Sequence, residues 1–249
     1  MPDGESGSAA RSGEEPNAEQ DSGEPVEHRR RLLVQHLADA LRLYVLTDTG
    51  LAAGRDEADI ERRAIGGGAT AIQLRWKTGP MRRALELGRQ LRELCHASGV
   101  PFIVNDRVDL ALALDADGVH VGVDDLPVAE TRKLVGDRML VGYSPPTLDD
   151  ALRAAREGAD YLGVGPVYPT TTKLDAGTAV NVAQVKSIAE VVGLPVVGIG
   201  GITAGNAAPV IEAGAAGVAV ISAVVAAKDV RAAAVELRRV IDAALEERQ

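Results

Sequence analysis

The chain has 249 residues, 46% of them hydrophobic, which is enough for the core of one large α/β domain or two small ones. Its single cysteine, Cys95, excludes an intramolecular disulfide and favours the reducing cytoplasm. Residues 1–27 hold eight acidic residues against one arginine, so most of the net charge of −9 lies there, and the composition gives no indication of a nucleic-acid partner.

The first 42 residues lack the pattern of a compact domain. Residues 1–27 are rich in Gly, Ser, Glu and Pro, which predicts a disordered acidic tail before a folded domain over 28–249. The sequence HRRRLLV at 28–34 is similar to the start of an export signal, but Gln35, His36 and Asp39 interrupt its apolar run. No run approaches the roughly 18 apolar residues of a membrane span. We therefore expect a short amphipathic helix over 28–41, no export and no membrane segment.

From residue 43 on, short apolar runs alternate with segments of helical periodicity. We expect eight strands, near residues 43–46, 71–74, 102–104, 118–121, 139–141, 161–164, 196–199 and 217–221. Helices are expected between them, for example over 81–97, 148–157 and 230–245. Eight such units favour a single α/β domain, a (β/α)8 TIM barrel, and an open doubly wound sheet is the alternative.

In such a barrel the functional groups collect just after the strands, and polar residues do follow the apolar runs here. Asp106 and Asp125 end neighbouring strands, which lie about 4.8 Å apart in a sheet. Two carboxylates so placed can share one cation, and ligation by oxygen alone favours Mg²⁺. Taken singly, Asp106 is better read as the cap of a helix near Val108, and Asp125 as the start of the turn at Pro127.

Cationic and glycine-rich segments occupy the same predicted face. Arg75, Lys77 and Lys173 follow strands, and together with a divalent cation they would suit a diphosphate. The segment GIGGITAGN at 198–206 exposes backbone N–H groups before a helix expected near Ala204. Ser222 follows the last strand, and phosphate sites of these barrels commonly use these two loops. The alternative is that the glycines only permit tight packing.

The sequence contains no set of residues for nucleophilic or paired acid and base catalysis. Cys95 shares the apolar stripe of a helix with Leu91, which predicts a packing function. His120 lies inside a predicted strand between Val119 and Val121, which predicts a hydrogen-bonded structural function. The chemistry therefore has to come from charge stabilisation and from positioning.

Five segments together resemble the thiamine-phosphate synthase family, in its order and spacing. They are QLRWK at 73–77, NDRVDLAL at 105–112, DGVHVGVDDLP at 117–127, GADYLGVGPVYPTTTK at 158–173 and GIGGITAGNAAPVIEAGAAGVAVISAV at 198–224. The resemblance implies an enzyme that joins a pyrimidine diphosphate to a thiazole monophosphate and releases pyrophosphate. It implies small-molecule substrates and Mg²⁺ as cofactor. A homo-oligomer is compatible with the sequence, which does not determine the number of subunits.

The resemblance also assigns residues. It implies that the pyrimidine diphosphate is held by Gln73, Arg75, Lys77, Asn105, Ser144 and Lys173. It implies that Mg²⁺ is bound by Asp106 and Asp125, and that the thiazole phosphate is held by Thr170, Thr172, Gly201, Ile221 and Ser222. The catalytic residues implied are Arg75, Lys77, Ser144 and Lys173.

Three positions depart from the family pattern. Val123 stands where a Gln is usual, Pro146 stands where a His is common two residues after Ser144, and residues 177–180 differ from the usual sequence. These departures affect neither an implied metal ligand nor a diphosphate cation, and we expect Val123 and Pro146 to alter the pyrimidine pocket or the rate. The rival readings are a thiazole tautomerase, a non-catalytic phosphate sensor and a sugar-phosphate epimerase.

Overall fold

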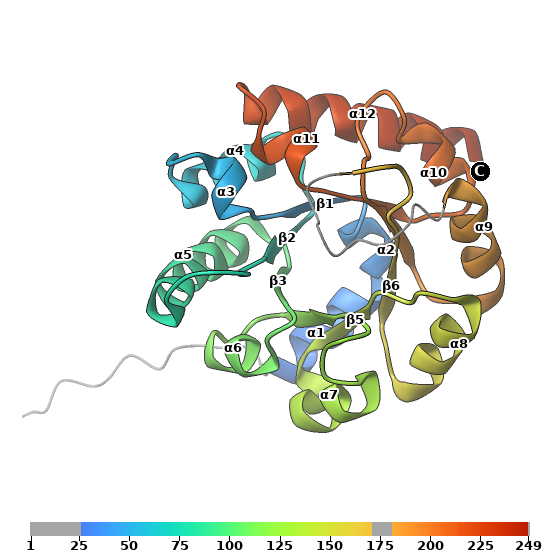
Figure 1. Cartoon of the computed structure of the whole chain (residues 1–249), viewed down its shortest axis with the longest axis horizontal. Coiled ribbons are helices and arrows are strands. Elements are labelled where there is room, and N and C mark those ends of the chain that lie inside the picture. The colour runs from blue at the N-terminus through green and yellow to red at the C-terminus, as the bar shows by residue number, and fades with distance from the viewer. Residues whose placement is uncertain (1–25, 171–180, 249) are drawn as a thin grey trace, which may run out of the picture.

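The computed structural model describes residues 26–170 and 181–248, with side chains from Arg31 on. Eight parallel strands form a closed barrel in which each strand pairs with the next along the chain and β8 pairs with β1 (Figure 1). The strands are β1 (Leu43–Leu46), β2 (Ala71–Leu74), β3 (Phe102–Asn105), β4 (Gly118–Val121), β5 (Leu140–Tyr143), β6 (Tyr161–Val164), β7 (Val196–Ile199) and β8 (Gly217–Val220). The predicted TIM barrel is confirmed, and the open sheet is wrong.

Helices surround the barrel on its outer side (Figure 1). They are α3 (Thr49–Ala52), α4 (Glu57–Gly66), α5 (Met81–Ser98), α6 (Val108–Ala113), α7 (Val128–Val135), η1 (Gly136–Arg138), α8 (Leu148–Glu157), α9 (Asn181–Val192), α10 (Ala208–Glu212), α11 (Ser222–Val225) and α12 (Val230–Arg248). Local capping marks several of their ends: the side chain of Thr147 accepts from the amide of Asp150 at the start of α8, and Gly158 adopts a left-handed conformation at its end.

The strands are buried on both faces because the barrel interior and the helix layer each need an apolar surface. Alternate residues of β1 illustrate this: Leu43 and Val45 pack in the core between strands and helices, whereas Tyr44 and Leu46 belong to the cluster inside the barrel. Cys95 is fully buried beside Leu91 on α5, as predicted.

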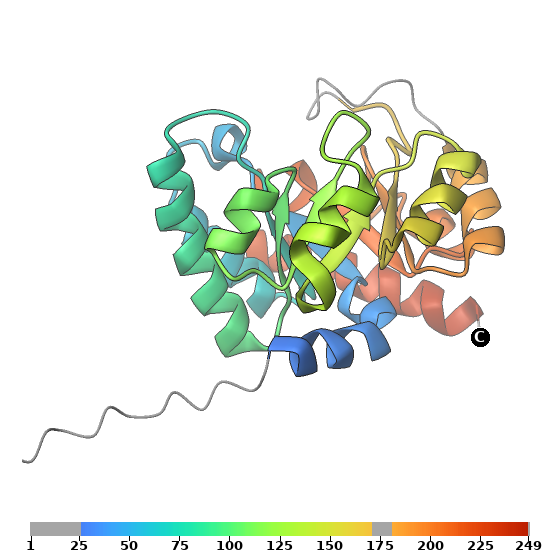
Figure 2. The same cartoon turned by 90° about the horizontal axis from the view of Figure 1, so that it is seen from below.

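Two short helices, α1 (Val26–Gln35) and α2 (Leu37–Ala40), cover the end of the barrel at which the strands begin (Figure 2). Leu37 and Leu41 pack into the interior cluster from this end. The single helix predicted over 28–41 is therefore two helices, separated at His36. The acidic tail predicted at 1–27 lies outside the described residues, apart from its last two, with which α1 begins.

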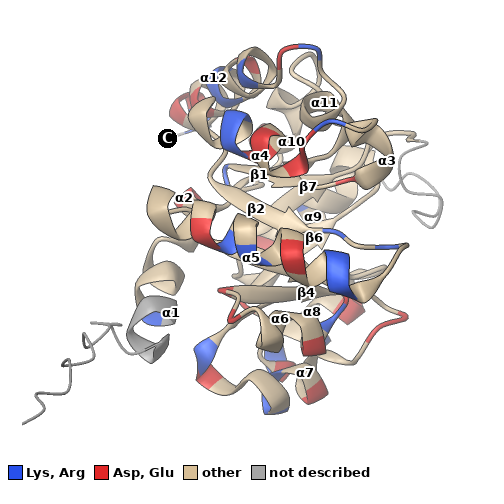
Figure 3. Cartoon of the chain, turned by 90° about the vertical axis from the view of Figure 1, so that its left-hand side faces the viewer, with Lys and Arg blue, Asp and Glu red and all other residues tan. Residues whose placement is uncertain are grey.

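Acidic and basic residues are interspersed on the outer helices, as on α5 and α12 (Figure 3). Many form ion pairs within one helix, such as Arg63 with Asp59 at 2.7 Å and Arg238 with Asp242 at 2.8 Å. Such exposed pairs contribute little to stability, and no continuous basic stripe is visible in this view. No helix in the described ranges is long and apolar enough to cross a membrane.

One helix boundary differs from the prediction. The helix expected near Ala204 begins only at Ala208, as α10. The side chain of Asn206 causes this delay: it accepts from the amide of Thr203 at 2.7 Å and donates to the carbonyl of Gly201 at 3.0 Å. An asparagine that bonds the nearby backbone in this way stabilises a turn in place of a helix.

Candidate active site

A cavity of about 370 Å³ opens at the carboxyl ends of the strands, the end opposite α1 and α2. Segments that follow seven of the eight strands, β2 to β8, contribute to its wall. The predicted site residues on this wall are Lys77, Asn105, Asp106, Asp125, Ser144, Thr170, Gly201, Ile221 and Ser222. A volume of this size suits a small-molecule ligand.

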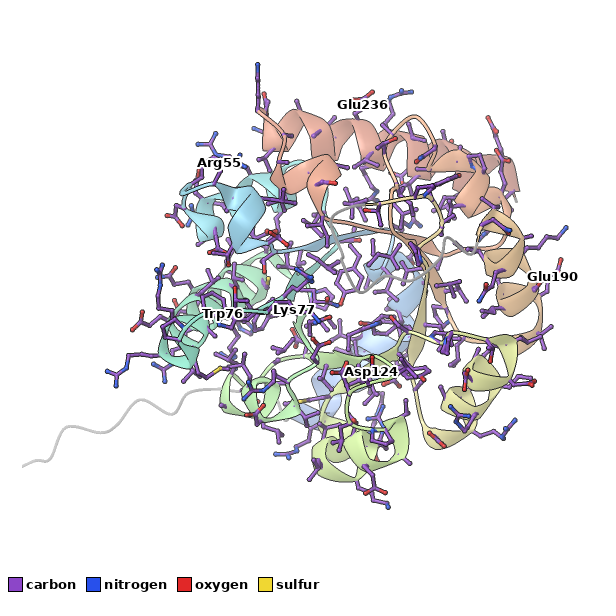
Figure 4. All side chains as sticks on the ribbon, viewed as in Figure 1. Arg55, Trp76, Lys77, Asp124, Glu190 and Glu236 are labelled. Atoms are coloured by element: carbon purple, nitrogen blue, oxygen red, sulfur yellow. The ribbon has the colours of Figure 1, made fainter. Side chains whose placement is uncertain are left out.

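A lysine and two carboxylates lie at the ends of β2, β3 and β4. The Nζ atom of Lys77 lies 3.0 Å from Oδ2 of Asp106. In Figure 4 the side chain of Lys77 lies over the centre of the barrel, whereas Trp76 before it lies toward α5. Burial raises the pKa of Asp125, and the adjacent carboxylate of Asp106 raises it further. The pair therefore forms a negative site with one ammonium beside it.

The backbone around the two carboxylates holds them in place. Asp106 has a φ of 63°, uncommon for a residue other than glycine, and its amide donates to the carbonyl of His120 at 2.7 Å. Asp125 accepts from the amide of Gly122 at 2.7 Å. Helix α6 is capped at Arg107 and not by Asp106. The capping function considered for Asp106 is therefore wrong. Asp125 closes the turn that begins at Gly122, which is not the turn at Pro127 considered for it. An unusual backbone conformation of this kind is often found at functional sites.

Arg75 lies beside this group but does not line the cavity. Its guanidinium donates to Oδ2 of Asp48 at 2.8 Å, and only 10% of its side chain is exposed. Oδ1 of Asp48 accepts from the amide of Leu51 and so caps α3. The amide of Arg75 donates to Oγ1 of Thr47 at 2.9 Å. Arg75 thus joins the ends of β1 and β2.

Gln73 and Ser144 belong to a polar chain that runs through the interior of the barrel. Gln73 is 2% exposed and lines a second cavity of about 10 Å³ beneath the first. Ser144 lines both cavities, and its Oγ lies 2.8 Å from Nε2 of His120. His120 is buried and also lies 3.1 Å from the hydroxyl of Tyr161, which confirms the hydrogen bonding predicted for it, and it lines the first cavity as well.

Backbone groups form the opposite side of the cavity, after β6, β7 and β8. Gly200 and Gly201 have φ values of 95° and 67°, and Ser222 begins α11. At Gly201 a side chain would not fit, because a Cβ atom would lie 2.7 Å from the carbonyl oxygen of Pro169. The side chains that line the cavity on this side, in the described part of the chain, are not ionisable. Thr172 and Lys173 lie outside the described residues, so their assignments stay predictions.

Several residues of the site were missed from the sequence. Asp48 follows β1 and carries the same signal as the residues that were singled out, a polar group just after a strand. Tyr44 and Tyr161 gave no such signal, because an aromatic residue inside a strand is usually a core residue. Asn206 stands in the quoted segment at 198–206, where its contact with Gly201 depends on the turn.

The departures Val123 and Pro146 both lie on the wall of the cavity. Val123 is 64% exposed, which is unusual for a large apolar side chain. It precedes Asp124, which is labelled in Figure 4, and both residues line the cavity. The carbonyl of Pro146 accepts from Gln184 of α9 at 3.0 Å. These positions can therefore contact a ligand.

Comparisons with known proteins agree on one family. The profile of the family described as thiamine monophosphate synthase matches residues 43–224. A thiamine-phosphate synthase of Chloroflexus aurantiacus is 52% identical over 208 residues, which are 84% of this chain and 95% of that protein. One of Moorella thermoacetica is 52% identical over 199 residues, 80% of this chain and 95% of that protein. The solved structure of a thiamine phosphate pyrophosphorylase from Pyrococcus furiosus superposes with a TM-score of 0.77 at 43% identity, covering 84% of this chain and 99% of that one.

Proposed function

We propose that this chain, which belongs to the thiamine monophosphate synthase family and is a transferase of thiamine biosynthesis, binds its two substrates in two halves of the cavity. The charged half, with Lys77, Asp106 and Asp125, binds a metal-bound diphosphate. The backbone half, with Gly201 and Ser222, binds a monophosphate. The substrates are 4-amino-5-hydroxymethyl-2-methylpyrimidine diphosphate and a thiazole monophosphate. The observation that carries this assignment is the grouping of Lys77, Asp106 and Asp125 on one wall of the cavity that has Gly201 and Ser222 on another.

In the charged half, Lys77 is the lysine that lines the cavity among the described residues, paired with Asp106, and Asn105 and Ser144 border the same space. Arg75 contributes through its pair with Asp48, and Gln73 through the polar chain beneath the cavity. Lys173 belongs to the same set by resemblance. In the backbone half, the phosphate is held by Thr170, Gly201, Ile221 and Ser222, with Thr172 assigned by resemblance.

The donor set fits Mg²⁺. Burial raises the pKa of Asp125 and the carboxylate of Asp106 raises it further, and a divalent cation held by the two residues would favour their charged forms. No group of three or more candidate metal-binding side chains occurs among the described residues. Two carboxylates are still sufficient, because Mg²⁺ usually keeps waters and takes further oxygens from substrate phosphates. When bound, the ion would neutralise charge that develops on the departing pyrophosphate.

The reaction breaks one bond and forms one. The bond between the pyrimidine methylene carbon and the diphosphate oxygen breaks, and its electron pair leaves with pyrophosphate. The lone pair of the thiazole nitrogen then forms a bond to the methylene cation. Neither step needs a proton from the protein, which agrees with the lack of an acid and base pair in the sequence. Lys77 stabilises the leaving group, and the two halves hold the reacting atoms in line.

The rival functions explain less of this site. A tautomerase or a sugar-phosphate epimerase of the same barrel would use the backbone half, but it would leave Lys77, Asp106 and Asp125 without a ligand. A sensor that only binds a thiazole phosphate would not need the charged half. The single buried cysteine fits a protein of the cytoplasm, where we place the enzyme.

Pyrophosphate release by the purified full chain tests the proposal. The pyrimidine diphosphate is supplied with and without the thiazole phosphate, in Mg²⁺ or in EDTA. We expect release only with both substrates and Mg²⁺. Release that persists in EDTA would contradict the metal assignment, and a folded protein that releases none would favour the tautomerase or the sensor.

A matched pair of variants tests Lys77. We expect Lys77→Ala to lose most of its turnover, because the cation next to the leaving group is removed. Lys133→Ala is the control: Lys133 also pairs with a carboxylate, Glu130 at 2.6 Å, but lies on α7 and does not line the cavity. Equal activity of the two variants would exclude the function proposed for Lys77.

A further inference from the structure

A continuous line of hydrogen bonds crosses the barrel interior beneath the active site. Nε2 of Gln73 lies 2.6 Å from the hydroxyl of Tyr44, which lies 3.0 Å from the hydroxyl of Tyr161. That hydroxyl is 3.1 Å from Nδ1 of His120, and Nε2 of His120 is 2.8 Å from Oγ of Ser144. The five residues come from β2, β1, β6, β4 and the end of β5, and together we name them the interior chain.

The fold makes room for the interior chain at a glycine. Gly142 of β5 pairs in register with His120 on one side and Tyr161 on the other. A Cβ atom at Gly142 would lie 2.3 Å from the ring of Tyr161 and 2.4 Å from Nδ1 of His120. Any side chain there would push the two rings apart. The close approach of Tyr161 and His120 therefore depends on a glycine at this position.

The donor and acceptor properties of these groups favour one direction of donation along the interior chain. The amide nitrogen of Gln73 can only donate, so the hydroxyl of Tyr44 accepts from it and keeps its own proton to donate. Either hydroxyl can be the donor between Tyr44 and Tyr161, and we assign Tyr44 as the donor. With Tyr44 as the donor, the hydroxyl of Tyr161 donates to Nδ1 of His120. A neutral imidazole that accepts at Nδ1 carries its proton on Nε2, and so donates to Ser144. The oxygen of Ser144 is thereby used as an acceptor, and its hydroxyl proton is left to donate.

We propose that the interior chain is a positioning array that makes Ser144 a hydrogen-bond donor toward the cavity. Its ligand there is a substrate atom with a free lone pair, of the kind that an aromatic ring nitrogen offers. The proposal rests on the proposed function, since it deepens the assignment of Ser144 to the pyrimidine. The opposite direction would leave Ser144 donating to His120, and it could then only accept from the substrate.

Burial favours a single direction of the hydrogen bonds along the interior chain. Tyr44, Tyr161 and Gln73 are each no more than 2% exposed, so bulk water does not compete for their protons. The Oε1 atom of Gln73 is buried and has no hydrogen-bond partner among the described residues. Gln73 borders the cavity of about 10 Å³, a size near that of one water molecule, together with Ser144. The start and the end of the interior chain therefore meet at the same small space.

The direction can be measured without substrate. The full chain is prepared with ¹⁵N-labelled histidine, and the signals of His120 are assigned by their loss in His120→Asn. We expect the neutral tautomer with its proton on Nε2. A proton on Nδ1, or on both nitrogens at neutral pH, would overturn the proposal. In Tyr161→Phe, Nδ1 loses its donor, and we expect a mixture of the two tautomers.

A double-mutant cycle connects the direction to catalysis. We expect Tyr161→Phe to lower kcat/KM about tenfold, and the double variant with Ser144→Ala to be no less active than Ser144→Ala alone. Losses that multiply would overturn the proposal, because Tyr161 would then act by another route. Tyr143→Phe is the control. It removes the hydroxyl of a tyrosine on the same strand as Gly142, but one that packs in the core that faces the helices, and we expect unchanged kcat/KM.

Failure of the proposed function gives a different result. In that case wild-type protein releases no pyrophosphate with both substrates and Mg²⁺, whatever the tautomer of His120. An active wild type in which Ser144→Ala has no effect overturns the assignment of Ser144 and this inference together. Thermal unfolding of each variant shows whether a loss of activity comes from a loss of folding.

Discussion

The two halves of the cavity are built from different chemical groups. Every ionisable side chain that lines the cavity in the described residues lies in β4 or follows β2, β3 or β4: Lys77, Asp106, His120, Asp124 and Asp125. The half after β6, β7 and β8 offers glycines, Thr170, Ser222 and backbone. A group that leaves as pyrophosphate gains charge in the reaction, whereas a phosphate that only anchors its substrate does not. Charged side chains at fixed positions stabilise the departing pyrophosphate, whose charge increases during the reaction. Backbone amides at fixed positions are sufficient to bind the anchoring phosphate, whose charge stays the same.

This comparison predicts that a change in the charged half lowers kcat and a change in the backbone half raises a KM. The largest effect is expected for Asp106→Asn. We expect kcat to fall at least about a hundredfold, a loss typical of removing one preorganised charge that acts on a transition state. Steady-state kinetics with both substrates measures this.

The matched control for Asp106 is Asp115→Asn. Asp115 also has a positive φ, 48°, and also pairs with a cation, Arg92 at 2.5 Å, but it lies outside the cavity. We expect unchanged kcat for Asp115→Asn. A lower kcat in both variants would indicate a general effect of the backbone conformation. It would contradict the prediction that kcat depends on the charged half.

The next effect is expected for Gly201→Ala. A Cβ atom at Gly201 would collide with the loop after β6, since Tyr168 and Pro169 lie within 3 Å of its position. We expect the KM for the thiazole phosphate to rise about tenfold, which corresponds to about 1.4 kcal/mol of binding free energy. The KM for the pyrimidine diphosphate should hardly change.

Gly99→Ala separates this collision from simple backbone strain. Gly99 has the same φ of 67° at the end of α5, but no atom lies within 4 Å of its Cβ position. Both variants should lose stability, by roughly 1 kcal/mol from the left-handed conformation. Only Gly201→Ala should change a KM. An altered KM for the pyrimidine diphosphate alone would reverse the assignment of the halves.

A smaller effect is expected for Arg55→Ala. The guanidinium of Arg55 donates to the carbonyls of Val225 and Ala227 at the end of α11, and to those of Leu51 and Ala52 of α3 (Figure 4). It thus connects the segment that carries Asp48 to the segment that begins with Ser222. We expect a rise of about threefold in the KM for the thiazole phosphate, in line with the loss of modest exposed hydrogen bonds.

Arg231→Ala is the control for Arg55. Arg231 is also exposed and donates to a backbone carbonyl, that of Gly66 at 3.2 Å, but this contact lies outside the cavity. We expect Arg231→Ala to leave both KM values unchanged. If Arg55→Ala lowered kcat without a change in KM, the backbone half would take part in the chemical step and the comparison would need revision.

No effect on activity is expected for Glu61→Gln, which lies in the helix layer outside both halves. Glu61 is 1% exposed, its Oε2 has no hydrogen-bond partner in the described part of the chain, and burial raises its pKa from 4.5 to about 8. The folded state therefore binds a proton that the unfolded state releases between these pH values. Its contribution to stability is present below about pH 4.5 and is lost as the pH rises through about 8.

Denaturant unfolding of wild type and Glu61→Gln from pH 5 to pH 8.5 measures this contribution. We expect wild type to lose stability with rising pH by an amount on the order of a few kcal/mol more than Glu61→Gln does. Identical pH profiles would mean that Glu61 is solvated or paired in solution. A change in kcat would show that the helix layer affects the site.

Periodicity alone was enough for most of the architecture. Five of the eight strands have the predicted bounds, and α8 spans Leu148–Glu157 as predicted. These elements are defined by local properties: apolar runs bounded by turns, and a Thr cap before a helical stripe. The prediction was wrong near Ala204 and at His36, because a side-chain contact of Asn206 and the packing of two short helices under the barrel decided those boundaries.

The sequence by itself determined the barrel and the position of polar groups after strands, since both follow from residue order along the chain. It also carried the family resemblance, which assigned the residues of both halves. Only the tertiary structure decided which of these groups meet. Arg75 turns to Asp48, Lys77 turns to Asp106, and the interior chain joins five strand positions that are up to 117 residues apart. The physical reason is closure of the barrel, which brings distant residues within hydrogen-bond distance and excludes the water that would otherwise compete for their bonds.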